Sequence, residues 1–209
     1  LTGLKWTLLG RLASQLLTWI VTIYVIRLLN PEDYGLMALA TIFSALFTLV
    51  AEIGLGATLI QTKDLPIEKI RQIFGLVVLS NGLVCILMAA IVAPLAALFF
   101  AEERLLLLIQ IIALQFIPAA FSVVPAAMLE RELKFRGRSI SDFCANIGGA
   151  LVILTLAVFN YGVFALAWGS VLIAVIRTIG LNIAYPLLFK PSFNFSGCKA
   201  FLNFGGNVA

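Results

Sequence analysis

The sequence has no histidine and few charged residues, and these absences narrow the chemistry that it can support. None of its 209 residues is histidine, which excludes Ser-His-Asp catalysis, Cys-His catalysis and His-containing metal sites. Charged residues make up 11% of the chain, against about 25% in an average soluble domain. Hydrophobic residues make up 62%. A soluble core of this length cannot bury that much apolar surface, so the expected solvent is lipid.

Cysteine is also scarce. Cys85, Cys144 and Cys198 have no metal-ligand spacing and are expected to be small hydrophobic residues, so no metal site is predicted. The gaps between the apolar runs are too short to house an active site, which indicates that the chain is not an enzyme by itself. Its net charge of +4 does not indicate nucleic-acid binding, because the basic residues lie at the ends of apolar runs.

Long apolar runs are what the chain has in abundance. Six of them follow one another, at about residues 6–29, 35–61, 73–100, 105–129, 140–160 and 163–189. Each has roughly 20 or more residues, enough for a helix to cross about 30 Å of hydrocarbon. The predicted fold is an all-α membrane protein in which residues 1–190 form a lobe of six transmembrane helices. Residues 191–209 are expected to be a cytoplasmic linker and the truncated start of a seventh span, so the chain is expected to be part of a longer protein.

Basic residues orient these spans. Eleven of the fourteen Lys and Arg residues lie near the N-terminus, in the second and fourth gaps, or after the sixth run. The fourth gap is the most basic, with Arg131, Lys134, Arg136 and Arg138. Because Lys and Arg are retained on the cytoplasmic side, the N-terminus, these two gaps and the C-terminal end are predicted to be cytoplasmic.

Four charged residues lie inside the predicted spans, where a charge costs about 2.5–3.5 kcal/mol. They are Arg11, Glu52, Asp142 and Arg177, all within roughly 5–18 Å of a cytoplasmic span end. One cavity open to the cytoplasm could therefore gather them. Arg11 and Arg177 are the candidate phosphate-binding residues, and Glu52 and Asp142 are candidates for gating or charge pairing. The alternatives are that Arg11 and Asp142 snorkel to the interface and that Glu52 pairs with Arg177 as a structural bridge.

Uncharged polar residues inside the spans extend this candidate site. Gln15 lies four residues after Arg11, on the same helix face. The other candidates for substrate binding are Asn81, Asn146 and Asn182. Hydrogen bonding between helices is the alternative role for the same residues.

Two prolines interrupt the fourth apolar run. Pro118 and Pro125 lie seven residues apart. Proline lacks an N–H and clashes with the preceding turn, so this span is predicted to be bent or broken, with some backbone carbonyls freed. These prolines are candidate hinge residues.

Three ordered motifs resemble those of one transporter family. The segment from Arg27 to Ala38, with its Asn-Pro-Glu-Asp-Tyr-Gly turn, resembles the turn after span one of polysaccharide-biosynthesis flippases. Gly54 to Gln61 resembles their end of span two, and Glu130 to Arg136 resembles their basic loop after span four. The chain therefore resembles the oligosaccharide flippases, of the O-antigen and exopolysaccharide translocase type. These belong to the multidrug/oligosaccharidyl-lipid/polysaccharide exporter superfamily.

The resemblance implies the N-terminal half of a two-lobe exporter in the bacterial plasma (inner) membrane. Its expected function is to move an undecaprenyl-diphosphate-linked oligosaccharide from the cytoplasmic to the periplasmic leaflet, for synthesis of lipopolysaccharide or exopolysaccharide. Alternating access through a polar cationic cavity is the expected mechanism. The expected partners are the lipid-linked oligosaccharide, membrane lipid and other polysaccharide-assembly proteins. No cofactor is expected, and a coupling ion or the membrane potential is left open as the energy source.

Two other functions stay open. One is cation-coupled multidrug export within the same superfamily, against which the lack of an acidic residue in span one argues. The other is a non-transporting membrane scaffold for a glycan-assembly complex.

Overall fold

The fold is helical throughout the part of the chain that the structure describes. The computed structural model describes residues 15, 18–19, 21–52, 66–186 and 191–192, with the backbone alone at positions 50 and 52. Residues 21–28 are helical. The helices that follow are α2 (Pro31–Glu52), α4 (Ile67–Leu87), the π-helical turn η1 (Met88–Val92), α5 (Ala93–Phe100), α6 (Glu103–Ala113), α7 (Phe116–Arg131), α8 (Phe135–Val158) and α9 (Val163–Ala184). No strand occurs among these residues.

Five of the described segments are long and apolar enough to cross a membrane. They are Pro31–Leu49, Ile67–Phe100, Glu103–Arg131, Phe135–Val158 and Val163–Ala184. The predicted all-α membrane class is thus confirmed. Half of the predicted first span, 6–29, falls outside the described residues, so the count of six spans stays a prediction, as does the linker predicted at 191–209.

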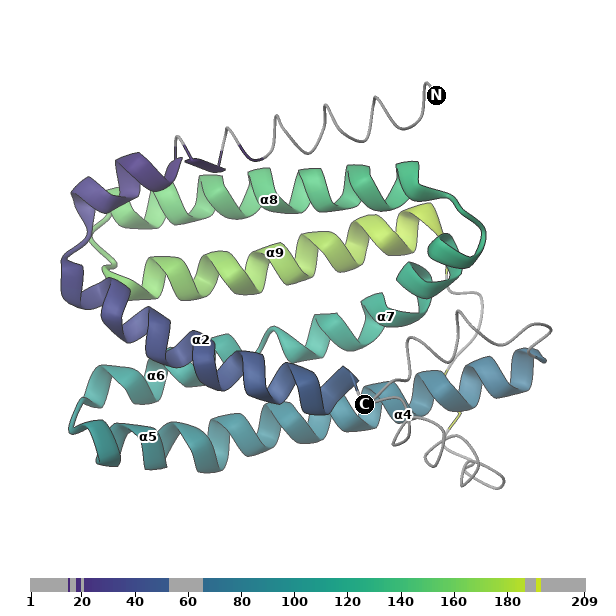
Figure 1. The fold of residues 1–209 in the computed structure, drawn as a ribbon, viewed down its shortest axis with the longest axis horizontal. Coiled ribbons are helices and arrows are strands. Elements are labelled where there is room, and N and C mark those ends of the chain that lie inside the picture. The colour runs from purple at the N-terminus through teal and green to yellow at the C-terminus, as the bar shows by residue number, and fades with distance from the viewer. Residues whose placement is uncertain (1–14, 16–17, 20, 53–65, 187–190, 193–209) are drawn as a thin grey trace.

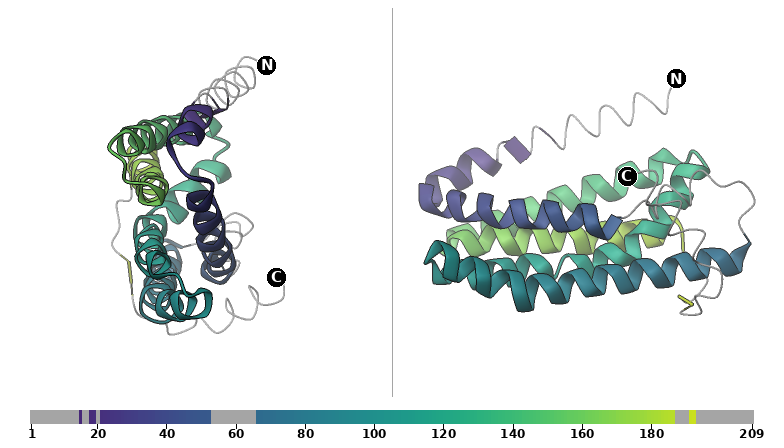
Figure 2. Two further views of the ribbon diagram at one scale, coloured as in Figure 1. Left: turned by 90° about the vertical axis from the view of Figure 1, so that its left-hand side faces the viewer. Right: turned by 60° about the horizontal axis from the view of Figure 1, so that its bottom comes forward.

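The helices form two groups that α2 and α7 join. The α4–η1–α5 rod lies along α6 on one side of the molecule, and α8 lies along α9 on the other (Figure 1). The end-on view shows α2 beside both groups (Figure 2, left), and α6 of one group also contacts α9 of the other. Helix α7 contacts α4 in one group and α9 in the other. A cavity between the two groups is therefore bounded by α2 and α7.

Helices α8 and α9 form a tightly packed hairpin, as the turn at Asn160-Tyr161-Gly162 predicts. A Cβ atom on Gly149 would lie 2.1 Å from Ile173 Cγ1, and one on Gly169 would lie 2.1 Å from Ile153 Cγ1. The reciprocal fit of isoleucine over glycine brings the two backbones close together. Gly162 has a φ of 56°, a left-handed conformation that glycine adopts without strain. The hairpin is therefore expected to move as one unit.

Pro118 breaks the predicted fourth span into α6 and α7. The proline ring conflicts with the carbonyl four residues earlier, at Leu114. The last turn of α6 tightens there, since the Leu114 N–H donates to Ile111 O and the Gln115 N–H donates to Ile112 O, each at 3.1 Å. The broken helix predicted for this span is confirmed, while hinge motion at Pro118 or Pro125 stays a prediction.

Side-chain amides satisfy carbonyls that other prolines leave free. Pro125 cannot donate to Phe121 O, and Asn182 Nδ2 donates to that oxygen at 3.1 Å. Pro94 follows the π-helical turn, in which the Ala93 N–H donates five residues back to Met88 O. In the same register Pro94 would have to donate to Ala89 O, which it cannot do, and Gln110 Nε2 donates to this oxygen at 3.3 Å. These prolines are tolerated because a neighbouring helix supplies the missing donor.

One helix boundary differs from the prediction with a consequence for the site. The fifth span was expected to begin at residue 140, after a basic loop, but α8 begins at Phe135. The alternation of charge indicates the side of the membrane and not where a helix starts, so it does not distinguish a basic loop from a basic first turn. Arg136 and Arg138 therefore lie on the helix.

Candidate functional site

A cavity of about 720 Å³ lies between α2, α4, α7, α8 and α9. Polar side chains from all five helices line it: Thr41, Ser44, Thr48, Asn81, Gln115, Ser122, Glu130, Arg138, Ser170 and Arg177. Small residues, among them Ala45, Ala119 and Ala174, leave the open volume. This size suits a small-molecule headgroup, since ligand sites usually hold about 300–1,000 Å³.

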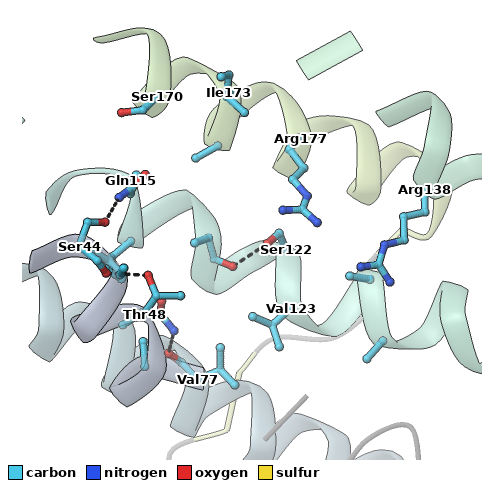
Figure 3. A pocket seen from close by; sticks show the side chains of 18 of the residues that line it. Ser44, Thr48, Val77, Gln115, Ser122, Val123, Arg138, Ser170, Ile173 and Arg177 are labelled. Carbon is cyan, nitrogen blue, oxygen red and sulfur yellow. Dashed lines mark hydrogen bonds between the residues drawn. The ribbon is translucent and has the colours of Figure 1, made fainter. Parts of the chain in front are cut away.

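One end of the cavity carries hydroxyl and amide groups. Gln115 Nε2 donates to Ser44 Oγ at 2.6 Å, which joins the break between α6 and α7 to α2 (Figure 3). Thr48 Oγ1 donates to Ser44 O at 2.8 Å, and Ser170 Oγ donates to Ala167 O at 2.7 Å. Because these hydroxyl protons are used within the helices, the oxygen lone pairs are the groups offered to the cavity. This end can accept hydrogen bonds from a polyhydroxylated ligand.

The other end of the cavity carries two arginines, each beside a carboxylate. The guanidinium groups of Arg177 and Arg138 point into the cavity from α9 and α8 (Figure 3). Arg177 Nε lies 2.9 Å from Asp142 Oδ1, and Arg138 Nη1 donates to Glu130 Oε2 at 2.5 Å. These arginine side chains are 42% and 33% exposed, so water reaches both. Guanidinium groups in this setting can bind a phosphate.

The turn beside this end is basic. Lys134 Nζ lies 2.6 Å from Glu132 Oε2, and this hydrogen bond raises the pKa of the Lys134 amine. The opposite end of the bundle is more acidic, because Arg104 contacts Glu102, Glu32 and Asp33 at 2.8, 3.7 and 3.7 Å. The hydrogen bond from Arg104 lowers the pKa of the Glu102 carboxyl. Both shifts favour the charged form of the group, in keeping with the charge asymmetry of the sequence.

Three residues predicted for the site lie at the cavity or beside it. Arg177 and Asn81 line it, and Asp142 contacts Arg177. Asn81 is 4% exposed and its Nδ2 donates to Val77 O at 2.9 Å within its own helix. The carboxylate beside Arg177 is therefore Asp142, whereas the Glu52 side chain lies outside the described part of the chain, as does Arg11.

The other predicted residues lie elsewhere. Asn146 lines a separate cavity of about 180 Å³, together with Thr18 and Tyr34. Asn182 Nδ2 donates to Phe121 O and to Thr178 O, a bond between helices as in the alternative role considered for it. Gln15 lies near the N-terminus, where it is helical and its side chain is exposed. The structure thus does not bring these three side chains to the 720 Å³ cavity.

Several cavity residues were missed in the sequence. For Arg138 and Glu130 the sequence indicates only a basic loop. Thr41, Ser44 and Thr48 are not among the predicted site residues, although their spacing of three and four residues places them on one face of a single helix. A hydroxyl stripe at helical spacing inside an apolar run was the signal that could have identified them.

Comparison with known proteins gives the family. Residues 24–209 match the family described as "Polysaccharide biosynthesis protein". The chain belongs to this family. With five described segments that are able to cross a membrane, it is a multi-pass protein of the bacterial plasma (inner) membrane.

Three curated relatives are similar over most of this chain. A membrane protein in the cps region of Klebsiella pneumoniae, named as uncharacterized, is 21% identical over 90% of the chain. The succinoglycan biosynthesis transport protein ExoT of Rhizobium meliloti is 24% identical over 91%, and the teichuronic acid biosynthesis protein TuaB of Bacillus subtilis is 24% identical over 98%. The chain spans 39%, 38% and 43% of the lengths of these relatives. No solved structure gives a significant match.

Proposed function

We propose that this chain is a lobe of a transporter that moves an undecaprenyl-diphosphate-linked oligosaccharide from the cytoplasmic to the periplasmic leaflet for polysaccharide export. Family membership supports a role in polysaccharide biosynthesis or transport. The observation that carries the finer proposal is the cavity, which combines two guanidinium groups with a hydroxyl and amide surface.

The two ends of the cavity match the two polar parts of such a cargo. Arg177 and Arg138 can donate to the diphosphate, whose charges would be costly to carry through hydrocarbon unaccompanied. Ser44, Gln115 and Ser170 can bind sugar hydroxyls. The polyprenyl tail would remain in lipid, where it has no transfer cost. The chain needs no catalytic group for this task.

The direction of loading follows from the position of the charged end. Glu130 and Arg138 flank the α7–α8 turn, which the positive-inside rule assigns to the cytoplasm. The arginines then lie nearest to the leaflet where a lipid-linked precursor would be assembled. Moving α7 about the break before Pro118 would change which end of the cavity is open.

Cation-coupled drug export has less support. A transported cation needs an uncompensated carboxylate, whereas both carboxylates beside the described cavity, Asp142 and Glu130, contact an arginine. A scaffold that transports nothing would have no use for a polar cavity of this size at membrane depth, since polar groups there are costly.

A complementation experiment tests the proposal. The full-length protein that contains this chain is expressed in a strain lacking it, and surface polysaccharide is measured. We expect Arg177→Gln and Arg138→Gln each to lower its accumulation rate about tenfold or more, because each removes a charge-assisted hydrogen bond worth about 1.5–3 kcal/mol. Arg136→Gln is the matched control, since this exposed arginine of α8 does not line the cavity.

The outcome that contradicts the proposal is equally concrete. If the Arg138→Gln, Arg177→Gln double variant restores surface polysaccharide as well as wild type at equal membrane abundance, the arginines do not bind the cargo.

A further inference from the structure

The side chains at the charged end of the cavity balance one another in charge. Arg177 has Asp142 beside it, and Arg138 has Glu130. These four side chains therefore sum to no net charge. Among the residues that the structure describes, the charged ones that line the cavity are Glu130, Arg138 and Arg177, and Asp142 lies beside the lining against Arg177. A guanidinium that binds a phosphate here does so beside a carboxylate that attracts the same positive charge. Phosphate binding therefore competes with these two ion pairs.

We propose that Asp142 and Glu130 are internal competitors for the anion site. The phosphate end of the ligand binds by drawing the guanidinium groups away from these carboxylates, and the ion pairs close again when the ligand leaves. This inference rests on the proposed function, because it takes a phosphate ester as the ligand, but it assigns a role to two further residues. Asp142 and Glu130 set the affinity by competing with the ligand for the arginines; they do not bind the ligand.

The Arg177–Asp142 contact has the geometry of an exchangeable pair. The Arg177 Nε atom is buried and 2.9 Å from Asp142 Oδ1, yet its N–H makes no hydrogen bond to any described residue. The pair is thus held by charge at short range without an aligned donor. The Asp142 side chain is 37% exposed, so water can replace the guanidinium when a ligand displaces it. Partly hydrated pairs of this kind are weak, and a dianionic ligand can outcompete one.

The Arg138–Glu130 contact is the better-formed of the two pairs. Arg138 Nη1 donates to Glu130 Oε2 at 2.5 Å, between side chains that are 33% and 41% exposed. It joins α7 to α8, whereas the Asp142 pair lies within the interlocked α8–α9 hairpin. A movement of α7 would therefore part Glu130 from Arg138 and leave Asp142 beside Arg177. Glu130 is then the competitor whose strength changes with conformation, and Asp142 is the constant one.

The direction in which a carboxylate substitution changes the affinity for a phosphate ligand tests the inference. Binding of inorganic pyrophosphate to the purified full-length protein is measured by calorimetry at fixed ionic strength. Removing a competitor frees the arginine, so we expect Asp142→Asn and Glu130→Gln each to tighten binding about two- to fivefold, the range for a hydrated ion pair. If the carboxylates instead serve to hold the arginines in place, the same substitutions weaken binding.

Glu132→Gln separates competition from general charge. Glu132 lies on the turn between α7 and α8 and contacts Lys134, but it does not line the cavity. Its substitution is expected to leave pyrophosphate affinity unchanged. Equal tightening by Glu132→Gln would overturn the inference, since loss of any nearby negative charge would then explain the effect. Melting temperatures of the variants identify misfolded protein, and Glu130→Gln and Asp142→Asn serve as independent tests.

The result also distinguishes this inference from the function beneath it. Loss of pyrophosphate binding in Arg177→Gln, with unchanged or weaker binding in both carboxylate variants, overturns the competitor role and leaves the arginine site intact. If Arg177→Gln and Arg138→Gln bind pyrophosphate as tightly as wild type, the result overturns both the competitor role and the proposed function.

Discussion

At the scale of single residues, two glutamines five positions apart have separable roles. Gln115 lines the cavity and bonds Ser44, whereas Gln110 bonds Ala89 O, away from the cavity. We expect Gln115→Leu to lower surface polysaccharide severalfold with little loss of stability, because water in the cavity can solvate Ser44. Gln110→Leu should instead lower stability by about 1–3 kcal/mol, since it leaves a carbonyl unsatisfied, while export per folded molecule persists.

Complementation and thermal melting of the two variants check this pair of effects. The assignment of Gln115 to the sugar end fails if Gln110→Leu impairs export per folded molecule as much as Gln115→Leu does.

The sequence predicted individual residues unevenly, for a physical reason. Arg177 was identified because a charge deep in an apolar run has few explanations. Arg138 was overlooked because a basic residue near a span end is already explained by topology. Asn182 was a candidate binding residue, but its amide bonds Phe121 O, a carbonyl freed by Pro125. Depth in the membrane can be estimated from sequence, whereas the partner of a polar group depends on the neighbouring helix.

At the scale of elements, the α8–α9 hairpin depends on glycine at the contact. We expect Gly149→Ala to destabilise the protein by about 1–3 kcal/mol, because the new methyl would lie 2.1 Å from Ile173 Cγ1 and overpack the interface. Gly82→Ala in α4 is the matched control, since its Cβ would meet nothing within 4 Å. Melting temperatures of the two purified variants measure the difference. Equal stability of both would mean that the hairpin contact is not close-packed.

Helix breaks were easier to predict than helix starts. Pro118 gave the division between α6 and α7 because its effect on Leu114 is local and steric. The start of α8 at Phe135 was missed because its first turns are polar and basic, as a loop would be. The stripe formed by Thr41, Ser44 and Thr48 needed only helical spacing to be recognised. Its place in a cavity could be recognised only from the structure, in which residues of α7 and α9 line the same cavity.

At the scale of the whole molecule, composition gives the membrane class and charge gives an orientation, but neither gives a cavity. The cavity arises between the α4–α6 group and the α8–α9 hairpin, where residues of α2 and α7 complete its lining. That arrangement depends on contacts between distant segments, as between Gln115 and Ser44 or between Asn182 and Phe121. The motifs that resemble flippases anticipated the family, and the match over residues 24–209 confirms it.

Transport in a purified system tests the central claim most directly. The full-length protein is reconstituted in liposomes with the undecaprenyl-diphosphate-linked oligosaccharide of its source organism, and an enzyme that cannot cross the membrane reports the glycan exposed outside. Wild type should move the cargo across the bilayer far faster than protein-free liposomes, and the Arg138→Gln, Arg177→Gln double variant should not exceed the protein-free rate. A wild-type rate equal to that of protein-free liposomes, or a double variant as fast as wild type, would contradict the account.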